Sequence, residues 1–194
     1  MDIFETTLPG VLVLVPRRFG DARGWFSESW NARVLASKGL DLEFVQDNES
    51  FSAEAFTLRG LHFQAPPHAQ AKLVRCVAGR ILDVAVDARR SAPTFGQWTA
   101  RELTAAGGEQ LLIPAGFLHG FLTLEPACHV AYKCTDFYAP EADGAVRWDS
   151  VGIDWGLPNG ASPMLSTKDA AAPAFAEWSS PFNDSAATKK AGAQ

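Results

Sequence analysis

The segment Arg59-Gly60-Leu61-His62-Phe63-Gln64 places a histidine in an otherwise apolar run that is typical of a β-strand. A second such run, Gln70-Ala71-Lys72-Leu73-Val74-Arg75, follows after a short loop and carries a lysine. Side chains two residues apart on a strand share a face. His62 and Gln64 therefore point to the same side of the first strand. Together the two runs predict a sheet with a base and a cation close together.

Similar short β-rich runs recur along the chain and are separated by turns that contain Gly and Pro. Such even spacing is typical of an antiparallel sandwich or barrel. Helical pattern is scarce: we expect one short helix over residues 31–38, with Asn31 as its N-cap, and another near residues 170–177. The sequence predicts a mainly β antiparallel barrel with strands over residues 11–15, 58–64, 72–77, 81–86, 97–103, 110–113, 119–124 and 129–135.

The chain has 194 residues, of which 47% are hydrophobic and 20% charged, which suits one good core. We expect a single domain over residues 1–183 and a disordered polar tail over residues 184–194. The net charge of -5 argues against a nucleic-acid or anionic-membrane partner. No apolar run approaches the roughly 20 residues that span a bilayer, and the acidic N-terminus is unlike a signal peptide, so we expect a cytoplasmic protein.

The three cysteines show no C-x-x-C spacing, so the sequence indicates neither a disulfide framework nor a zinc ribbon.

Four side chains are candidates for acid–base chemistry inside the barrel. His62 alone is more often a hydrogen-bonded core histidine. Lys72, however, lies among apolar neighbours and needs a negative partner if it is buried, such as an anionic ligand or a developing enolate. Tyr132 can protonate a carbanion or enolate from the face opposite the base. Asp169 alone is most simply a surface or helix-capping acid, and it would fix a histidine tautomer only if the fold brings it near His62.

The spacing Gly108-x5-Pro114-x-Gly116-x2-His119 resembles the second motif of the cupins, a superfamily of small β-barrels. The first cupin motif usually supplies His-x-His and a later Glu as metal ligands, but here it appears as His62-Phe63-Gln64 without that Glu. Since a metal site needs two or three imidazoles plus a carboxylate, the resemblance implies a cupin-type barrel, or jelly roll, without a metal. A metal-dependent cupin oxygenase or isomerase with His62, Gln64 and His119 as ligands is the rival interpretation.

Six motifs occur in one order along the chain: Phe19-Gly20-Asp21-x-Arg23-Gly24-x-Phe26-x-Glu28, Val45-Gln46-Asp47-Asn48-x-Ser50, Leu58-Arg59-Gly60-Leu61-His62-Phe63-Gln64, Gln70-x-Lys72-Leu73-Val74, Gly116-Phe117-x-His119-Gly120-Phe121 and Tyr132-Lys133-x-Thr135-Asp136-x-Tyr138. Together they resemble the dTDP-4-dehydrorhamnose 3,5-epimerase family, over about residues 2 to 183.

The resemblance implies an isomerase that epimerises dTDP-4-dehydro-6-deoxy-D-glucose at C3 and C5 to dTDP-4-dehydro-L-rhamnose, in dTDP-L-rhamnose biosynthesis. It implies a homodimer with an exchanged N-terminal segment and no cofactor. Within this family, an enzyme that inverts only C3 or only C5 of a related nucleotide sugar is the alternative. A sugar-nucleotide-binding module without turnover is a further rival, which the acid, the base and the lysine together disfavour.

The resemblance also implies residue roles. His62 would be the general base paired with Asp169, Tyr132 would be the general acid, and Lys72 would stabilise the enolate beside the C4 carbonyl. Tyr138 would stack on thymine. The other implied substrate contacts are Arg23, Glu28, Gln46, Asp47, Asn48, Arg59, His119, Asp143 and Lys168, where Arg23 and Glu28 are expected to serve the neighbouring subunit and many relatives have Glu in place of Asp143.

Overall fold

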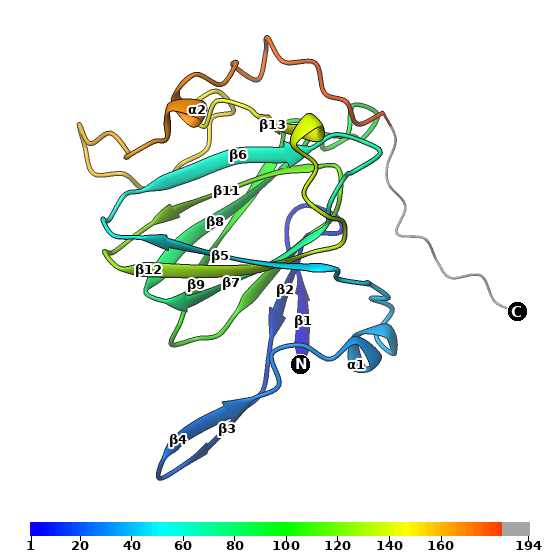
Figure 1. Cartoon of the computed structure of the whole chain (residues 1–194), viewed down its shortest axis with the longest axis vertical. Coiled ribbons are helices and arrows are strands. Elements are labelled where there is room, and N and C mark those ends of the chain that lie inside the picture. Colours follow the sequence, from blue (N-terminus) through cyan, green and yellow to red (C-terminus); the bar gives the residue numbers. More distant parts are fainter. Residues whose placement is uncertain (184–194) are drawn as a thin grey trace, which may run out of the picture.

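Two antiparallel sheets face each other in the computed structural model, which describes residues 1–183 (Figure 1). The six-stranded sheet has the order β1 (Asp2–Glu5), β2 (Leu12–Val15), β10 (Gln110–Ile113), β7 (Lys72–Ala78), β12 (Cys128–Cys134), β5 (Gln46–Ser52). The five-stranded sheet has the order β13 (Asp143–Ala145), β6 (Leu58–Gln64), β11 (Phe117–Thr123), β8 (Arg80–Asp87), β9 (Trp98–Thr104). A separate hairpin of β3 (Arg18–Asp21) and β4 (Gly24–Ser27) projects away from both sheets (Figure 1).

The prediction of a mainly β fold with a few short helices is confirmed, and each of the eight predicted strands corresponds to an observed one within two residues at either end. Strands β1, β3, β4, β5 and β13 were not predicted. The predicted tail over residues 184–194 lies outside the described residues, so the division of the chain into one domain and a tail stays a prediction.

The helices in the described part of the chain are short: α1 (Ala32–Ala36), the 3-10 turn η1 (Pro140–Ala142) and α2 (Thr167–Ala170). The predicted N-cap of α1 is confirmed, because the Asn31 side chain accepts a hydrogen bond from the Val34 N–H. The helix predicted near residues 170–177 was wrong in position. It begins earlier, where Ser166 caps it, and Pro173 cannot continue a helix.

Alternation along the strands divides the five-stranded sheet into an inner and an outer face. On β6, Leu61 and Phe63 point outward into an apolar cluster that the C-terminal segment, residues 146–182, completes with Val146, Trp155 and Phe182. Burying one such large apolar side chain stabilises the fold by about 1.5–3 kcal/mol. His62 and Gln64, one residue out of phase, therefore point to the interior between the sheets.

The side chains that line the interior change from apolar to polar along the strands. Val74 and Cys76 of β7 and Val130 of β12 belong to an apolar cluster that joins the two sheets. Lys72 continues the same face of β7, and Tyr132 continues that of β12 and packs against the edge of the cluster. One end of the interior is thus a packed core, and polar side chains line the other end.

Two glycines allow β6 and β11 to approach closely beside the inner histidines. A Cβ atom at Gly60 would lie 2.5 Å from the Cα of Gly120, and the φ of Gly60 is +138°. Such a φ and such a contact both require glycine. The pairing of β6 with β11 shifts register between His119 and Phe121, and His119 lies directly opposite His62.

No helix in residues 1–183 is long and apolar enough to cross a membrane. The three cysteines of the sequence are unpaired and buried. Burial raises the pKa of the Cys76 thiol to about 12, so this side chain is inert at neutral pH.

Candidate active site

A histidine–aspartate pair lies at the polar end of the interior, where His62 of β6 meets Asp169 of α2. The Nε2 of His62 and the Oδ1 of Asp169 are 2.6 Å apart, although the two residues are 107 positions apart in the sequence. The His62 side chain is 32% exposed and that of Asp169 only 3%. Because Nε2 faces the carboxylate, Nδ1 is the nitrogen that is left to accept a proton.

Asp169 belongs to α2, whose N-cap is Ser166. Burial alone would raise the pKa of Asp169, but its hydrogen bonds with His62, Ser166 and the Gly60 backbone outweigh this and lower the pKa below its usual value. The carboxylate is therefore ionised at neutral pH. It can hold the imidazole in one orientation and stabilise the imidazolium. The fold thus brings Asp169 to His62, which the sequence could not establish.

Lys72 and Tyr132 lie on the opposite sheet, on adjacent strands β7 and β12. The Nζ of Lys72 is 6.0 Å from the centroid of the Tyr132 ring. Burial lowers the pKa of Lys72, while nearby Cys134 and Asp83 partly oppose that effect. Burial also raises the pKa of Tyr132, which keeps the phenol protonated. In such a poorly solvated place an ammonium interacts strongly with a developing negative charge.

A second histidine–aspartate pair lies between β11 and β8. The Nε2 of His119 is 2.7 Å from the Oδ1 of Asp83, and the side chains are 7% and 0% exposed. Burial raises the pKa of Asp83 and lowers that of His119, and each effect is opposed by the partner. The Oδ2 of Asp83 has no hydrogen-bond partner among the described residues. Sequence reasoning missed Asp83, although an acid within the apolar run 81–86 was a usable signal.

Arg59 and Lys168 complete the surroundings of His62. The guanidinium of Arg59 donates to the Phe51 carbonyl at 2.9 Å and to the Ser52 hydroxyl at 3.3 Å. Lys168, next to Asp169 on α2, pairs with Asp143. A cavity of about 290 Å³ is lined by these predicted residues together with their neighbours: Arg59, His62, Lys168 and Asp169, with Thr57, Leu58, Met164, Leu165 and Ser166.

Tyr138 lies beyond the end of β12 and is 56% exposed. Its hydroxyl donates to Asp143 at 3.3 Å, and its backbone N–H donates to the Gln46 side chain at 2.9 Å. Gln46 in turn donates to Asn48 at 3.0 Å, and these two side chains share the inner face of β5. The structure therefore brings Tyr138, Asp143, Gln46 and Asn48 together as one connected group.

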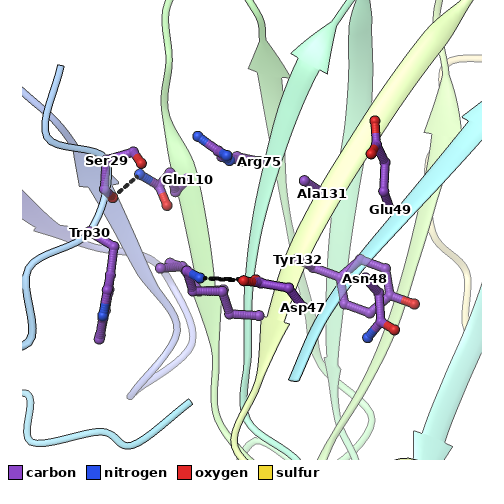
Figure 2. Close-up of a pocket in the computed structure, with 11 residues that line it drawn as sticks. Ser29, Trp30, Asp47, Asn48, Glu49, Arg75, Gln110, Ala131 and Tyr132 are labelled. Atoms are coloured by element: carbon purple, nitrogen blue, oxygen red, sulfur yellow. Dashed lines mark hydrogen bonds and ion pairs between the residues drawn. The ribbon is translucent and has the colours of Figure 1, made fainter. Parts of the chain in front are cut away.

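Three predicted contacts do not reach this interior within a single chain. Asp47 lies on the outer face of its sheet, where it pairs with Lys133 at 2.8 Å, while Asn48 and Tyr132 point to the other side (Figure 2). This outer face carries a separate cavity of about 340 Å³. Arg23 pairs with Asp21 in the projecting hairpin, and Glu28 lines a cavity beside α1. The ligand contacts expected of Asp47, Arg23 and Glu28 stay predictions.

The arrangement of donors disfavours the rival metal site. Gln64 is buried, and its amide nitrogen and oxygen are both held by backbone groups of His68, Phe137 and Ala139. Within residues 1–183, no three His, Cys, Asp or Glu side chains are grouped so that they could hold a metal ion.

Comparison with known proteins agrees with this geometry. The family model described as dTDP-4-dehydrorhamnose 3,5-epimerase matches residues 5–177. The chain belongs to this epimerase family. The dTDP-4-dehydrorhamnose 3,5-epimerase of Salmonella typhimurium is 48% identical over 176 residues, which cover 89% of this chain and 94% of that protein.

Solved structures of epimerases share the fold. A dTDP-6-deoxy-D-glucose-3,5-epimerase from Legionella pneumophila, in complex with dTDP-4-keto-L-rhamnose, matches with a TM-score of 0.90 and 39% identity, over 96% of this chain and 99% of that one. A 3'-monoepimerase from Streptomyces bikiniensis, in complex with dTDP-quinovose, matches with a TM-score of 0.82 and 31% identity, over 89% and 87%. The cupin-type fold predicted from the sequence is thereby confirmed.

Proposed function

We propose that this epimerase family member converts dTDP-4-dehydro-6-deoxy-D-glucose to dTDP-4-dehydro-L-rhamnose by inverting C3 and C5, as a step of dTDP-L-rhamnose biosynthesis. One observation carries the proposal above all: the His62–Asp169 pair lies on one side of the interior, and Lys72 and Tyr132 lie on the opposite sheet. A base and an acid on opposite sides of a sugar ring are what inversion at carbon needs.

The proposed chemistry uses the carbonyl that the substrate already carries. C3 and C5 both flank the C4 ketone, so both C–H bonds are acidified by it. The Nδ1 of His62 takes the proton, and the electron pair of the C–H bond moves onto the C4 oxygen as an enolate. Lys72 stabilises this charge, and Tyr132 returns a proton to the opposite face of the same carbon. One proton leaves the carbon and one returns to it, and the substrate is neither oxidised nor reduced overall, so the reaction requires no redox cofactor.

The nucleotide part of the substrate is proposed to bind beside Tyr138 and the side chains connected to it. The exposed ring of Tyr138 is free to stack on thymine, and Arg59 and Lys168 provide positive charge at the cavity. Charge-assisted hydrogen bonds from arginine and lysine suit a diphosphate. Asp143 pairs with Lys168, so we assign it to orienting that lysine rather than to a direct contact.

The active form is proposed to be a cytoplasmic homodimer with an exchanged N-terminal segment. The β3–β4 hairpin projects away from the sheets (Figure 1), and it exposes Phe19, Trp25 and Phe26 to 53%, 59% and 70%. Exposed aromatic side chains on a projecting element favour contact with another surface. The exchange would deliver Arg23 and Glu28 to the site of the neighbouring subunit.

An epimerase that acts at one centre is the second candidate, because a relative with the same fold is named a 3'-monoepimerase. The catalytic groups described above would serve either reaction. The difference depends on whether the sugar can present both C3 and C5 to His62 in turn.

The deciding experiment is NMR of dTDP-4-dehydro-6-deoxy-D-glucose incubated with the protein in deuterated water, with and without chelator. Deuterium at C3 and C5 with an L-configured product, unaffected by chelator, is expected. The Tyr132→Phe variant should still lose the proton but invert poorly. Label and inversion at one carbon would favour the single-centre enzyme, and absence of label at both carbons would contradict the proposal.

A further inference from the structure

Gln64 is the last residue of β6 and lies on the same inner face as His62, but it takes no part in the chemistry described above. It is 5% exposed. Its Nε2 donates to the His68 carbonyl at 2.8 Å and to the Phe137 carbonyl at 3.1 Å, and its Oε1 accepts from the Ala139 N–H at 2.8 Å. One side chain thus satisfies three backbone groups from two separate loops.

The groups at positions 137 and 139 flank Tyr138 directly. Residues 135–139 form neither helix nor strand, and the backbone groups next to Tyr138 pair with side chains instead of with a neighbouring strand. Gln64 holds the carbonyl before Tyr138 and the N–H after it, while Gln46 holds the N–H of Tyr138 itself at 2.9 Å. The backbone around this exposed aromatic ring is therefore fixed from the inside of the barrel.

We propose that Gln64 is a positioning residue that fixes the Tyr138 ring for a planar pyrimidine base and so sets the affinity for the nucleoside diphosphate. The inference rests on the proposed function, in which Tyr138 stacks on the base. On this interpretation β6 carries two tasks two residues apart, with His62 acting on the sugar and Gln64 acting through Tyr138 on the nucleotide.

Glutamine suits this position for a physical reason. Its amide offers two donors and one acceptor in a plane, which matches two carbonyls and one N–H. Leucine would leave all three backbone groups unpaired, and glutamate would place a carboxylate oxygen against two carbonyl oxygens. Either change frees the Tyr138 backbone without altering His62, Asp169 or Lys72.

The test combines dTDP binding by titration calorimetry with steady-state kinetics of epimerisation. Gln64→Leu is expected to raise the Kd for dTDP and the KM for the sugar nucleotide about tenfold, while kcat stays within about twofold, because ordering of the ligand site is lost but the reacting groups are kept. Gln64→Glu, which keeps the side-chain length, should change the same constants in the same direction.

Two controls separate this role from a general effect on folding. Ser180 is also buried and also bridges two backbone groups, the Ala88 carbonyl and the Phe182 N–H, far from Tyr138 in the sequence. Ser180→Ala should leave Kd and KM unchanged. In the Tyr138→Ala background, Gln64→Leu should add little to the Kd, since two residues that act as one unit are not additive.

Several outcomes would overturn the inference. An unchanged Kd and KM with a lower kcat would mean that Gln64 acts on proton transfer, and additive effects with Tyr138→Ala would mean that it acts independently of that ring. Failure of both Gln64 variants to fold would mean that Gln64 stabilises the whole fold and has no specific role in positioning Tyr138. Weakened dTDP binding in the variants without any turnover by the wild type would sustain the inference and refute the proposed reaction, whereas no dTDP binding by the wild type would overturn both.

Discussion

The two histidine–aspartate pairs have the same atoms in contact at nearly the same distance, yet their surroundings differ. His62 and Asp169 meet at 2.6 Å between a strand and a short helix of the C-terminal segment, with the histidine 32% exposed. His119 and Asp83 meet at 2.7 Å between two adjacent strands, with both side chains nearly inaccessible. A proton acceptor must reach its substrate, so only the first pair suits general-base catalysis.

The carboxylates differ in the same sense. Hydrogen bonds lower the pKa of Asp169 in spite of its burial, whereas burial raises the pKa of Asp83, one of whose oxygens has no partner among the described residues. Residue type and contact distance therefore do not define the task of such a pair. The task of each pair is defined instead by solvent access and by the number of hydrogen bonds to its carboxylate.

The largest expected effect comes from replacing each histidine by glutamine, which keeps a donor near the Nε2 position but cannot accept a proton. His62→Gln should lower kcat by at least about 1000-fold and abolish deuterium incorporation, since a positioned base contributes roughly 100- to 10,000-fold. His119→Gln should cost about tenfold and keep incorporation at both carbons. Equal losses in the two variants would break the distinction between the pairs.

A smaller effect is expected from replacing each aspartate by asparagine. An amide at position 169 can donate to the Nε2 of His62, which favours the tautomer with its proton on Nδ1, the nitrogen that must accept. Asp169→Asn should therefore lower kcat about 100-fold, while Asp83→Asn should lower it about fivefold or less. Steady-state rates at saturating substrate measure both, and a larger loss for Asp83→Asn would reverse the assignment.

The smallest effect concerns stability as a function of pH, and its sign differs between the pairs. Asp169 has a lowered pKa, so its stabilisation is complete above the ordinary value of 3.8 and is lost as the pH falls through the folded-state pKa. Asp83 has a raised pKa, so its contribution is complete below 3.8 and is lost as the pH rises towards the folded-state pKa.

Urea unfolding of the wild type and both asparagine variants at pH 4, 5.5 and 7 tests these signs. Since the Asp169 carboxylate stays ionised in the folded protein, the deficit of Asp169→Asn should not shrink between pH 7 and pH 5.5. The stability of Asp83→Asn relative to the wild type should improve with rising pH, by an amount that His119 and Lys72 reduce because both oppose the shift of Asp83. If the difference in stability between the wild type and Asp83→Asn stayed constant over this pH range, the Asp83 carboxyl group of the wild type would have an ordinary pKa, which would contradict the prediction.

The central strands could be predicted because their signal is local. The runs that form β6, β7 and β12 mix apolar with polar residues, and β10 is a short, mostly apolar run that ends before Pro114; all four were found within a residue or so. Strand β5 was missed as a strand, since its residues Gln46–Ser52 are mostly polar and only the pairing with β12 makes them a strand. The hairpin of β3 and β4 was also missed; its strands have four residues each and pair with each other outside the two main sheets.

The sequence by itself determined the class of fold, the order of the family motifs and, through the period of two, which side of each strand His62, Lys72 and Tyr132 would occupy. Only the tertiary structure decided the partners: Asp169 for His62, Asp83 for His119, and the Tyr138 loop for Gln64. The physical reason is that side-chain direction follows from neighbouring residues. A hydrogen bond between residues up to 107 positions apart depends instead on register and on the path of the C-terminal segment.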